Sequence, residues 1–404
     1  MKYLYLRLKR FCGFVAGFVF FIAGIFKLLD PVGAGLVMKE YMDFFHLGFM
    51  APLAKPLAVA LAFLETMVGT ALVTGVFRRL CAVTALAFQG FFTLVTLILV
   101  IFNPEMDCGC FGEAVHLTHM QTFLKNIVLC ALICIYIFPK SALGEPKARK
   151  YVSFSAVTIA VLLFAAYSWI YIPLVDFTDF KPATGLHAGS DSDTSVEDIY
   201  EAVFIYEKDG IQKEFGLDEL PDSTWTYVST ETVMKSSTDH SEANLSFYDA
   251  DGIYHDEMAT DGKVMIVSVY DIDMSRGRWN RAAAFLDRAE AAGFNTLLLV
   301  ASTPEEMQKK FYLLQEDTVE SLAPHIYFSD YKTLITMNRS NSGVTYFSGG
   351  FLIRKWSRAA RPSEKELHEI YSGDDTEVVI WHDTKGSLGL QGFLLAVFAI
   401  MLLF

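Results

Sequence analysis

Two cysteines separated by one glycine have the spacing most able to do chemistry in this chain. Cys108 and Cys110 flank Gly109, and Phe111 and Gly112 follow them. A disulfide between the two sulfur atoms would close a small ring, and ring strain makes a disulfide easier to reduce. Gly109 permits the tight backbone that such a ring requires. The spacing therefore predicts a labile thiol–disulfide couple, with Cys108 and Cys110 as its catalytic residues.

Two other interpretations of this pair stay open. The cysteines could be inert residues of a tight turn. They could also bind a metal ion, because His116 and His119 follow closely and would complete four nitrogen and sulfur ligands. That spacing fits no standard zinc pattern, so no metal site is predicted. His119 lies at an expected helix start, where Thr118 and Gln121 have the spacing of a capping box.

A carboxyl group lies near the centre of an apolar run. Glu65 is a functional candidate, because an ionisable group at membrane depth is costly. The alternative is a structural carboxyl that stays protonated, since burial disfavours its charge. Lys27 and Gln89 are candidate partners, although Lys27 could instead extend toward the membrane surface. The other four cysteines, expected to pack as small apolar side chains, are Cys12, Cys81, Cys130 and Cys134.

Long apolar runs must position these groups in a lipid bilayer. A hydrocarbon core of about 30 Å needs roughly 20 apolar residues per helix, and irregular backbone is not tolerated in lipid. A sixth run, 388–404, is at the short limit. Gly13 and Gly17 in the first run predict a close helix contact. The five runs of sufficient length are 11–29, 54–76, 80–102, 121–138 and 152–174.

Lysine and arginine set the expected orientation of these helices. They gather at the N-terminus and in the 77–80 and 139–151 connections, whereas 30–53 and 103–120 hold few or none. Cytoplasmic loops are enriched in these residues. The cysteine loop and residues 175–387 are therefore predicted to lie outside, in an oxidising compartment that lets the pair cycle. A cleaved signal peptide is disfavoured for the first run, which is too long and lacks a cleavage pattern.

The hydrophilic part of the chain is predicted to be an α/β domain. Residues 176–243 combine a linker, at 176–195, with a small β region whose strands at 203–206 and 212–215 form a hairpin. In 244–373, a strand at 245–248 and further strands alternate with helices before a closing hairpin, an order resembling the thioredoxin-like fold. That fold carries its redox cysteines after the strand at 263–270, but residues 271–275 contain none.

The soluble domain is consequently expected to lack thiol chemistry of its own. It would serve as a docking or sensing module, or be a degenerate domain kept for assembly. The whole chain has a net charge of −13, and the acidic residues are concentrated after residue 175. An acidic surface argues against nucleic acid as a partner.

Several of these residues together resemble the DoxX/MauE group of redox-associated membrane proteins. The resemblance rests on the run 24–31, which contains Lys27, Asp30 and Pro31, on Glu65, and on the run 108–112. It covers residues 1 to about 140 and implies a four-helix bundle with a role near disulfide or quinone chemistry. The MauE branch is linked to methylamine utilisation, as an accessory to maturation of methylamine dehydrogenase. The longer form resembles DoxX-like proteins of Bacteroidetes with a fused outer domain.

Three functions are therefore considered for a multi-pass protein of the bacterial inner membrane. In the first, the cysteine pair exchanges with a partner's thiols or passes electrons to a quinone. In the second, a non-catalytic assembly factor docks an unknown extracytoplasmic client through its acidic domain. In the third, Glu65 drives transport. The expected regions are a membrane domain at 1–140, a fifth helix within 141–175, soluble regions at 176–243 and 244–373, and a C-terminal helix at 388–404.

The orientation can be measured with reporter fusions. Fusions at about residues 112 and 250 should report the outer side, and a fusion at about residue 145 the cytoplasm, because lysine and arginine are retained inside. A cytoplasmic signal at residue 250 would reverse the predicted orientation of the whole chain.

Overall fold

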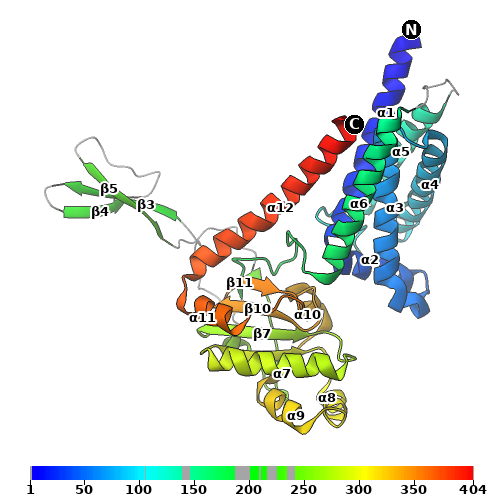
Figure 1. Cartoon of the computed structure of the whole chain (residues 1–404). Coiled ribbons are helices and arrows are strands. Elements are labelled where there is room, and N and C mark those ends of the chain that lie inside the picture. Colours follow the sequence, from blue (N-terminus) through cyan, green and yellow to red (C-terminus); the bar gives the residue numbers. More distant parts are fainter. Residues whose placement is uncertain are drawn as a thin grey trace. The chain divides into compact units, whose positions relative to one another are not determined.

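The computed structural model describes residues 2–104, 106–138, 146–186, 201–208, 211–215, 225–233 and 242–403. The chain divides into two compact units. The first comprises Met1–Thr178, Ser357–Ala360 and Trp381–Phe404, and the second comprises Asp179–Trp356 and Arg361–Ile380. Figure 1 labels their helices and strands.

The first unit is a bundle of apolar helices, and the chain is a multi-pass membrane protein. The five predicted runs are confirmed as helices, with ends that differ by up to nine residues at the first helix's start. Within the described residues, five helices are long and apolar enough to cross a membrane. The predicted C-terminal run lies in α12 (Asp375–Leu403), whose apolar part is the shorter Gly386–Leu402. The five long helices are α1 (Lys2–Leu29), α3 (Ala54–Thr74), α4 (Arg78–Phe102), α5 (His119–Ile137) and α6 (Ala148–Ile170).

The connection between the first two predicted spans is also helical, which the sequence reading missed. It contains α2 (Pro31–Phe44) and the short 3-10 helix η1 (Gly48–Leu53). The Asp30 carboxylate accepts hydrogen bonds from the backbone nitrogens of Val32 and Gly33, at 3.2 and 2.9 Å. Pro31 occupies the first turn, where its missing N–H costs nothing. The Asp-Pro pair in the 24–31 run is therefore a helix start signal.

Glycines bring α1 against its neighbours at very short range. A Cβ atom on Gly17 would lie 2.8 Å from the Gly69 carbonyl oxygen of α3, and one on Gly24 would lie 2.6 Å from the Ala62 oxygen. Gly13 instead faces the Tyr136 ring of α5. The close contact predicted for Gly13 and Gly17 is confirmed, but the two glycines contact different helices.

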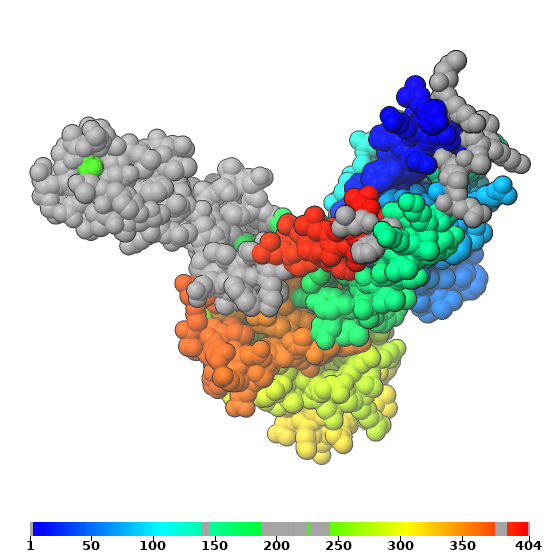
Figure 2. Space-filling view, turned by 45° about the horizontal axis from the view of Figure 1, so that its top comes forward, coloured from blue at the N-terminus to red at the C-terminus, as the bar shows by residue number. Residues whose placement is uncertain are grey.

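The apolar part of α12 packs antiparallel to α6 within the first unit. The Phe164 and Phe393 rings stack at 4.7 Å, and the Ser153 hydroxyl donates to the Ile400 carbonyl at 2.7 Å. Figure 2 shows the last turns of α12 in red beside the membrane helices. Of the cysteines expected to pack, Cys12 is buried, and Cys81 and Cys130 are partly buried. The expectation is wrong for Cys134, which is exposed on the bundle surface.

The second unit contains a mixed sheet with the strand order β6-β2-β11-β10-β7-β8-β9. Strands β7, β8 and β9 are parallel, and β10 pairs antiparallel with both β7 and β11. A seven-residue apolar strand is thus central, as the buried run predicted. The bounds are β2 (Gly185–Leu186), β6 (Glu242–Ala243), β7 (Lys263–Val269), β8 (Asn295–Val300), β9 (Ile326–Phe328), β10 (Gly343–Ser348) and β11 (Phe351–Trp356).

Alternate side chains of β7 enter two different cores. Met265 and Val267 face the core that holds α7, while Val264 and Ile266 face the core that holds α10. Figure 1 shows α7 along one side of β7. This is an α/β domain with a mixed sheet, and its thioredoxin-like identity stays a prediction. The helices are α7 (Arg276–Ala291), α8 (Pro304–Phe311), α9 (Glu316–Leu322), α10 (Tyr331–Met337) and α11 (Glu364–Ser372).

Two local predictions in this unit need correction. Residues 245–248 form no regular strand, because only Tyr248 makes isolated bridges, to Tyr254 and Phe328. The predicted linker contributes the short strand β2, since Gly185 pairs with Phe351 of β11 and with Glu242 of β6. The part of the linker from 187 to 195 lies outside the described residues.

The small β region contains a separate sheet with the order β4-β3-β5. Its strands are β3 (Glu201–Lys208), β4 (Ile211–Phe215) and β5 (Thr226–Val233). The predicted hairpin is confirmed by the antiparallel pairing of β3 with β4. β5 extends it on the other side of β3.

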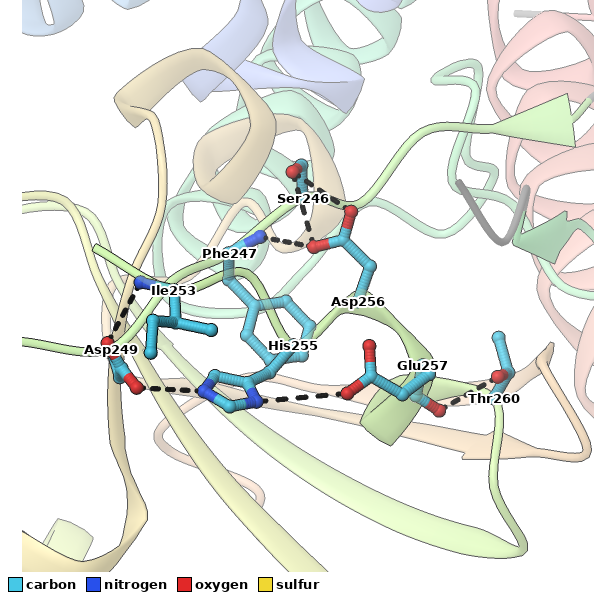
Figure 3. Close-up of polar contacts among 8 residues, drawn as sticks. All are labelled: Ser246, Phe247, Asp249, Ile253, His255, Asp256, Glu257 and Thr260. Atoms are coloured by element: carbon cyan, nitrogen blue, oxygen red, sulfur yellow. Dashed lines mark hydrogen bonds and ion pairs between the residues drawn. The ribbon is translucent and has the colours of Figure 1, made fainter. Parts of the chain in front are cut away.

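His255 lies in a hydrogen-bonded loop before β7 (Figure 3). His255 Nε2 lies 2.8 Å from Asp249 and its Nδ1 lies 3.7 Å from Glu257. The hydrogen bond from His255 holds the pKa of Asp249 below its usual value. Asp256 accepts hydrogen bonds from Ser246 and the Phe247 nitrogen. These contacts give the loop a structural role.

The α1–α3 contact can be tested at a single glycine. Replacing Gly69 by alanine places a Cβ 2.6 Å from the Gly17 oxygen, so α1 and α3 must separate, at a cost of about 1–3 kcal/mol. Gly90→Ala in α4 is the matched control, because nothing lies within 4 Å of its Cβ. Thermal unfolding in detergent should show a lower Tm for the first variant only. Equal Tm values would contradict the close contact.

Candidate functional site

The cysteine pair and the intramembrane carboxylate line one cavity. The cavity has a volume of about 310 Å³ and lies among α1 to α5, at the end of the bundle where α1 ends and α5 begins. Most of its wall is apolar. From the sequence alone, the cysteine pair and Glu65 are two separate candidates. The polar and reactive residues in the wall are Lys27, Tyr41, Glu65, Gln89, Thr96, Cys108, Cys110, Lys125 and Asn126.

Tight turns and α2 position the cysteine loop. Gly109 has a φ of +56°, and a Cβ atom there would collide with the Val37 side chain of α2. Glycine is thus required at this position both by the left-handed backbone and by packing. The Tyr41 hydroxyl donates to the Cys108 carbonyl oxygen at 2.9 Å. After Cys108 the chain enters the short extended segment β1 (Cys110–Glu113).

The two thiols differ in exposure and electrostatics. Cys108 is 6% exposed, whereas Cys110 is partly exposed, and both are free. Burial raises the pKa of the Cys108 thiol, and the charges of Cys110 and Asp107 raise it further. The nearby Thr122 hydroxyl and the charge of Lys125 act in the opposite direction. The reduced form of Cys108 therefore rests as a thiol, and Cys110 is the sulfur that reagents reach more easily.

Lys27 and Glu65 form a buried ion pair across α1 and α3. The Lys27 ammonium lies 2.9 and 2.7 Å from the two carboxylate oxygens. The two side chains are 13% and 4% exposed. Lys27 therefore does not extend to the surface, and its ammonium is within hydrogen-bond distance of both carboxylate oxygens. Gln89 donates to the Asn126 carbonyl at 3.4 Å, and no described hydrogen bond joins it to Glu65.

The two histidines do not join the cysteines. His116 Nδ1 lies 3.4 Å from Asp107, and His119 Nε2 lies 3.1 Å from the Met106 carbonyl oxygen. Both line a separate hollow of the 100–120 region. In the part of the chain that the structure describes, no group of three His, Cys, Asp or Glu side chains is arranged to hold a metal ion. The predicted capping box at Thr118 is present.

Several residues in the cavity wall were not found from the sequence. Tyr41 lies on the helix that was missed. Lys125 is the only charged residue of its apolar run, which was a usable signal of function. Asn126 donates to the Thr96 hydroxyl at 3.2 Å and so joins α5 to α4. A lone polar residue in an apolar run does not indicate which side of its helix faces the cavity. Only the packed bundle shows which polar residues line it.

The cavity lies wholly within a segment that matches a known family. Residues 2–139 match the family described as methylamine utilisation protein MauE. This part of the chain is a MauE-type membrane segment. Residues 200–237 match a domain of unknown function, DUF8463, which includes β3 to β5. No curated protein and no solved structure significantly matches the chain.

Hydrogen bonds hold the turn after β7, which is the segment where a thioredoxin-like fold would carry redox cysteines. The Asn341 side chain accepts from the backbone nitrogens of Tyr270 and Asp271 and donates to the Asp271 oxygen. Ser342, with a φ of +65°, is 1% exposed, and Arg361 donates to its carbonyl oxygen. These polar groups satisfy one another, which is typical of a structural turn.

The ion pair can be separated from its function by matched variants. Glu65→Gln should lower the Tm in detergent, because an unpaired buried Lys27 costs about 3–5 kcal/mol. The double variant Lys27→Met with Glu65→Leu removes both charges and should recover most of the loss. If the double variant folds but is inactive in a complementation assay, the pair has a role beyond stability. A double variant as unstable as the single one would contradict the ion pair as the source of the loss.

Proposed function

We propose that this protein is a membrane thiol–disulfide oxidoreductase that oxidises thiols of an extracytoplasmic protein and passes the electrons to a quinone. The observation that carries the proposal is the shared cavity, whose wall contains both Cys108–Cys110 and the Lys27–Glu65 pair. A reactive dithiol and a buried proton-bearing pair thus face one apolar space.

The exchange step follows from the difference in exposure between the two sulfur atoms. A client thiolate attacks the Cys110 sulfur of the Cys108–Cys110 disulfide, a bond forms between client and Cys110, and the electron pair leaves on Cys108. A second client thiolate then attacks the mixed disulfide and releases Cys110. The client is oxidised by two electrons, and Cys108 and Cys110 are reduced to a dithiol.

The cavity wall fits a quinone. A volume of about 310 Å³ lies at the lower end of the range of small-molecule sites, and such sites combine an apolar wall with a few polar groups. A quinone would be the oxidant that restores the pair: the Cys108–Cys110 dithiol forms its sulfur–sulfur bond and gives up two electrons and two protons, which reduce the quinone to a quinol. The Lys27 ammonium would donate one hydrogen bond to a carbonyl oxygen of the quinone ring. Its other N–H groups would keep donating to Glu65. Tyr41 and Val37 hold the cysteine loop against the cavity.

The remaining parts of the proposal rest on the sequence. The Lys/Arg asymmetry favours a bacterial inner membrane protein with the cysteine loop and soluble domain on the periplasmic side. The strand and helix order of 244–373, without cysteines at 271–275, supports a thioredoxin-like domain that docks the client. The name of the MauE family ties its members to methylamine utilisation, and we carry over only a role in maturing an extracytoplasmic protein.

Transport is a second candidate function. The observation that favours it is the buried Lys27–Glu65 pair in the wall of a cavity. A transporter would keep its activity when both cysteines are serine, whereas the oxidoreductase would not. An assembly factor acting through its soluble domain would also tolerate these substitutions.

The proposed function is tested by thiol trapping in intact membranes. Cys108 and Cys110 should interconvert between dithiol and disulfide as the redox buffer changes. Their double replacement by serine should abolish complementation of a deletion without lowering the amount of protein. Cys134→Ser is the control, because this cysteine is exposed on the bundle surface. Full complementation by the double serine variant would overturn the proposal.

A further inference from the structure

One lysine in the cavity wall has no part in the exchange and quinone steps described so far. Lys125 lies on α5, and its ammonium is 4.8 Å from the centroid of the Phe111 ring. Phe111 directly follows Cys110. A cation over an aromatic face is attracted by the ring, so this contact fixes the ammonium beside the cysteine loop. The same lysine lines the cavity together with Cys108, Gly109 and Cys110.

The surroundings of Cys108 otherwise oppose a negative charge. The sulfur is buried, and Asp107 and Cys110 add negative charge nearby. Tyr41 donates to the carbonyl oxygen of Cys108, and burial raises the pKa of its phenol, so this group stays neutral. Asp107 is itself 3.4 Å from His116. A thiolate on Cys108 therefore needs a source of positive charge.

Two side chains on neighbouring turns of α5, Thr122 and Lys125, favour a negative charge on Cys108. The Thr122 hydroxyl is fully buried, has no hydrogen-bond partner of ordinary geometry among the described residues, and acts on the Cys108 thiol. Lys125 follows three residues later on the same side of the helix. Both lower the pKa of Cys108 against the effect of burial.

We propose that Lys125 is a positioning residue that stabilises the Cys108 thiolate and thereby makes Cys108 a better leaving group when a thiolate attacks the Cys108–Cys110 disulfide. The inference rests on the proposed function. In the exchange step the electron pair of the broken sulfur–sulfur bond goes to Cys108, and Lys125 neutralises the charge that appears there. The proton of the client thiol passes to water. A sulfur whose thiolate is stabilised leaves faster, so the disulfide is attacked and reduced more quickly.

The test uses the full-length protein in detergent with Lys125→Met. Two quantities are measured, the pH dependence of Cys108 alkylation, resolved by mass spectrometry, and the rate at which glutathione reduces the Cys108–Cys110 disulfide. The variant should shift alkylation to higher pH, with about fivefold slower reaction at pH 7, and should slow the reduction of the disulfide to a similar degree. Lys125→Arg should restore both, because it keeps the charge. Thr122→Val should shift both in the same direction.

The matched control is Lys55→Met. Lys55 lies over the Trp169 ring at 4.5 Å but outside the cavity wall, so both quantities should stay unchanged. Lys125→Gln is measured in parallel, so that an answer is obtained if the methionine variant does not fold. The inference is overturned if the pair cycles in all variants with the same alkylation profile and the same rate of disulfide reduction. A pair that forms no disulfide in the unmodified protein would instead overturn the proposed function.

Discussion

The buried Lys27–Glu65 ion pair is the interaction on which the membrane unit depends most. Two charges in an apolar bundle are stable only when their geometry is close to ideal, because removing them from water costs several kcal/mol for each ion. Distances of 2.7 and 2.9 Å require α1 and α3 to lie very near each other. Gly17, Gly24 and Gly69 make this approach sterically feasible. Glycine contacts and ion pair therefore support the same helix pairing.

The cavity beside this pair is lined by residues of α2 and of the cysteine loop. α2 begins at the Asp30 cap, directly after α1 ends, and its Val37 and Tyr41 side chains contact the loop at Gly109 and Cys108. The cysteine loop and the ion pair thus line the same cavity. α2, which carries neither the cysteines nor the charged pair, holds the loop in place there. Burial disfavours the thiolate form of Cys108, and the positive charge of Lys125 on α5 counteracts that effect.

The second unit is built by a different rule. Its strands β7 and β8 are parallel and buried on both faces, so alternate side chains of β7 fill two cores. The turn after β7 is tied to Asn341 by three hydrogen bonds, which leaves its polar groups satisfied. Residues 176–404 contain no cysteine, so this unit has no thiol of its own.

The sequence by itself determined the membrane helices, the hairpin of β3 and β4, and the chemical identity of the cysteine loop. These depend on apolar length, local turn signals and residue type, all of which act over short stretches of chain. Only the tertiary structure decided that Lys27 binds Glu65, that Cys134 is exposed, and that Lys125 faces the cysteine loop. Each depends on the rotation of a helix about its axis, which packing against neighbouring helices sets and which a uniformly apolar run does not encode.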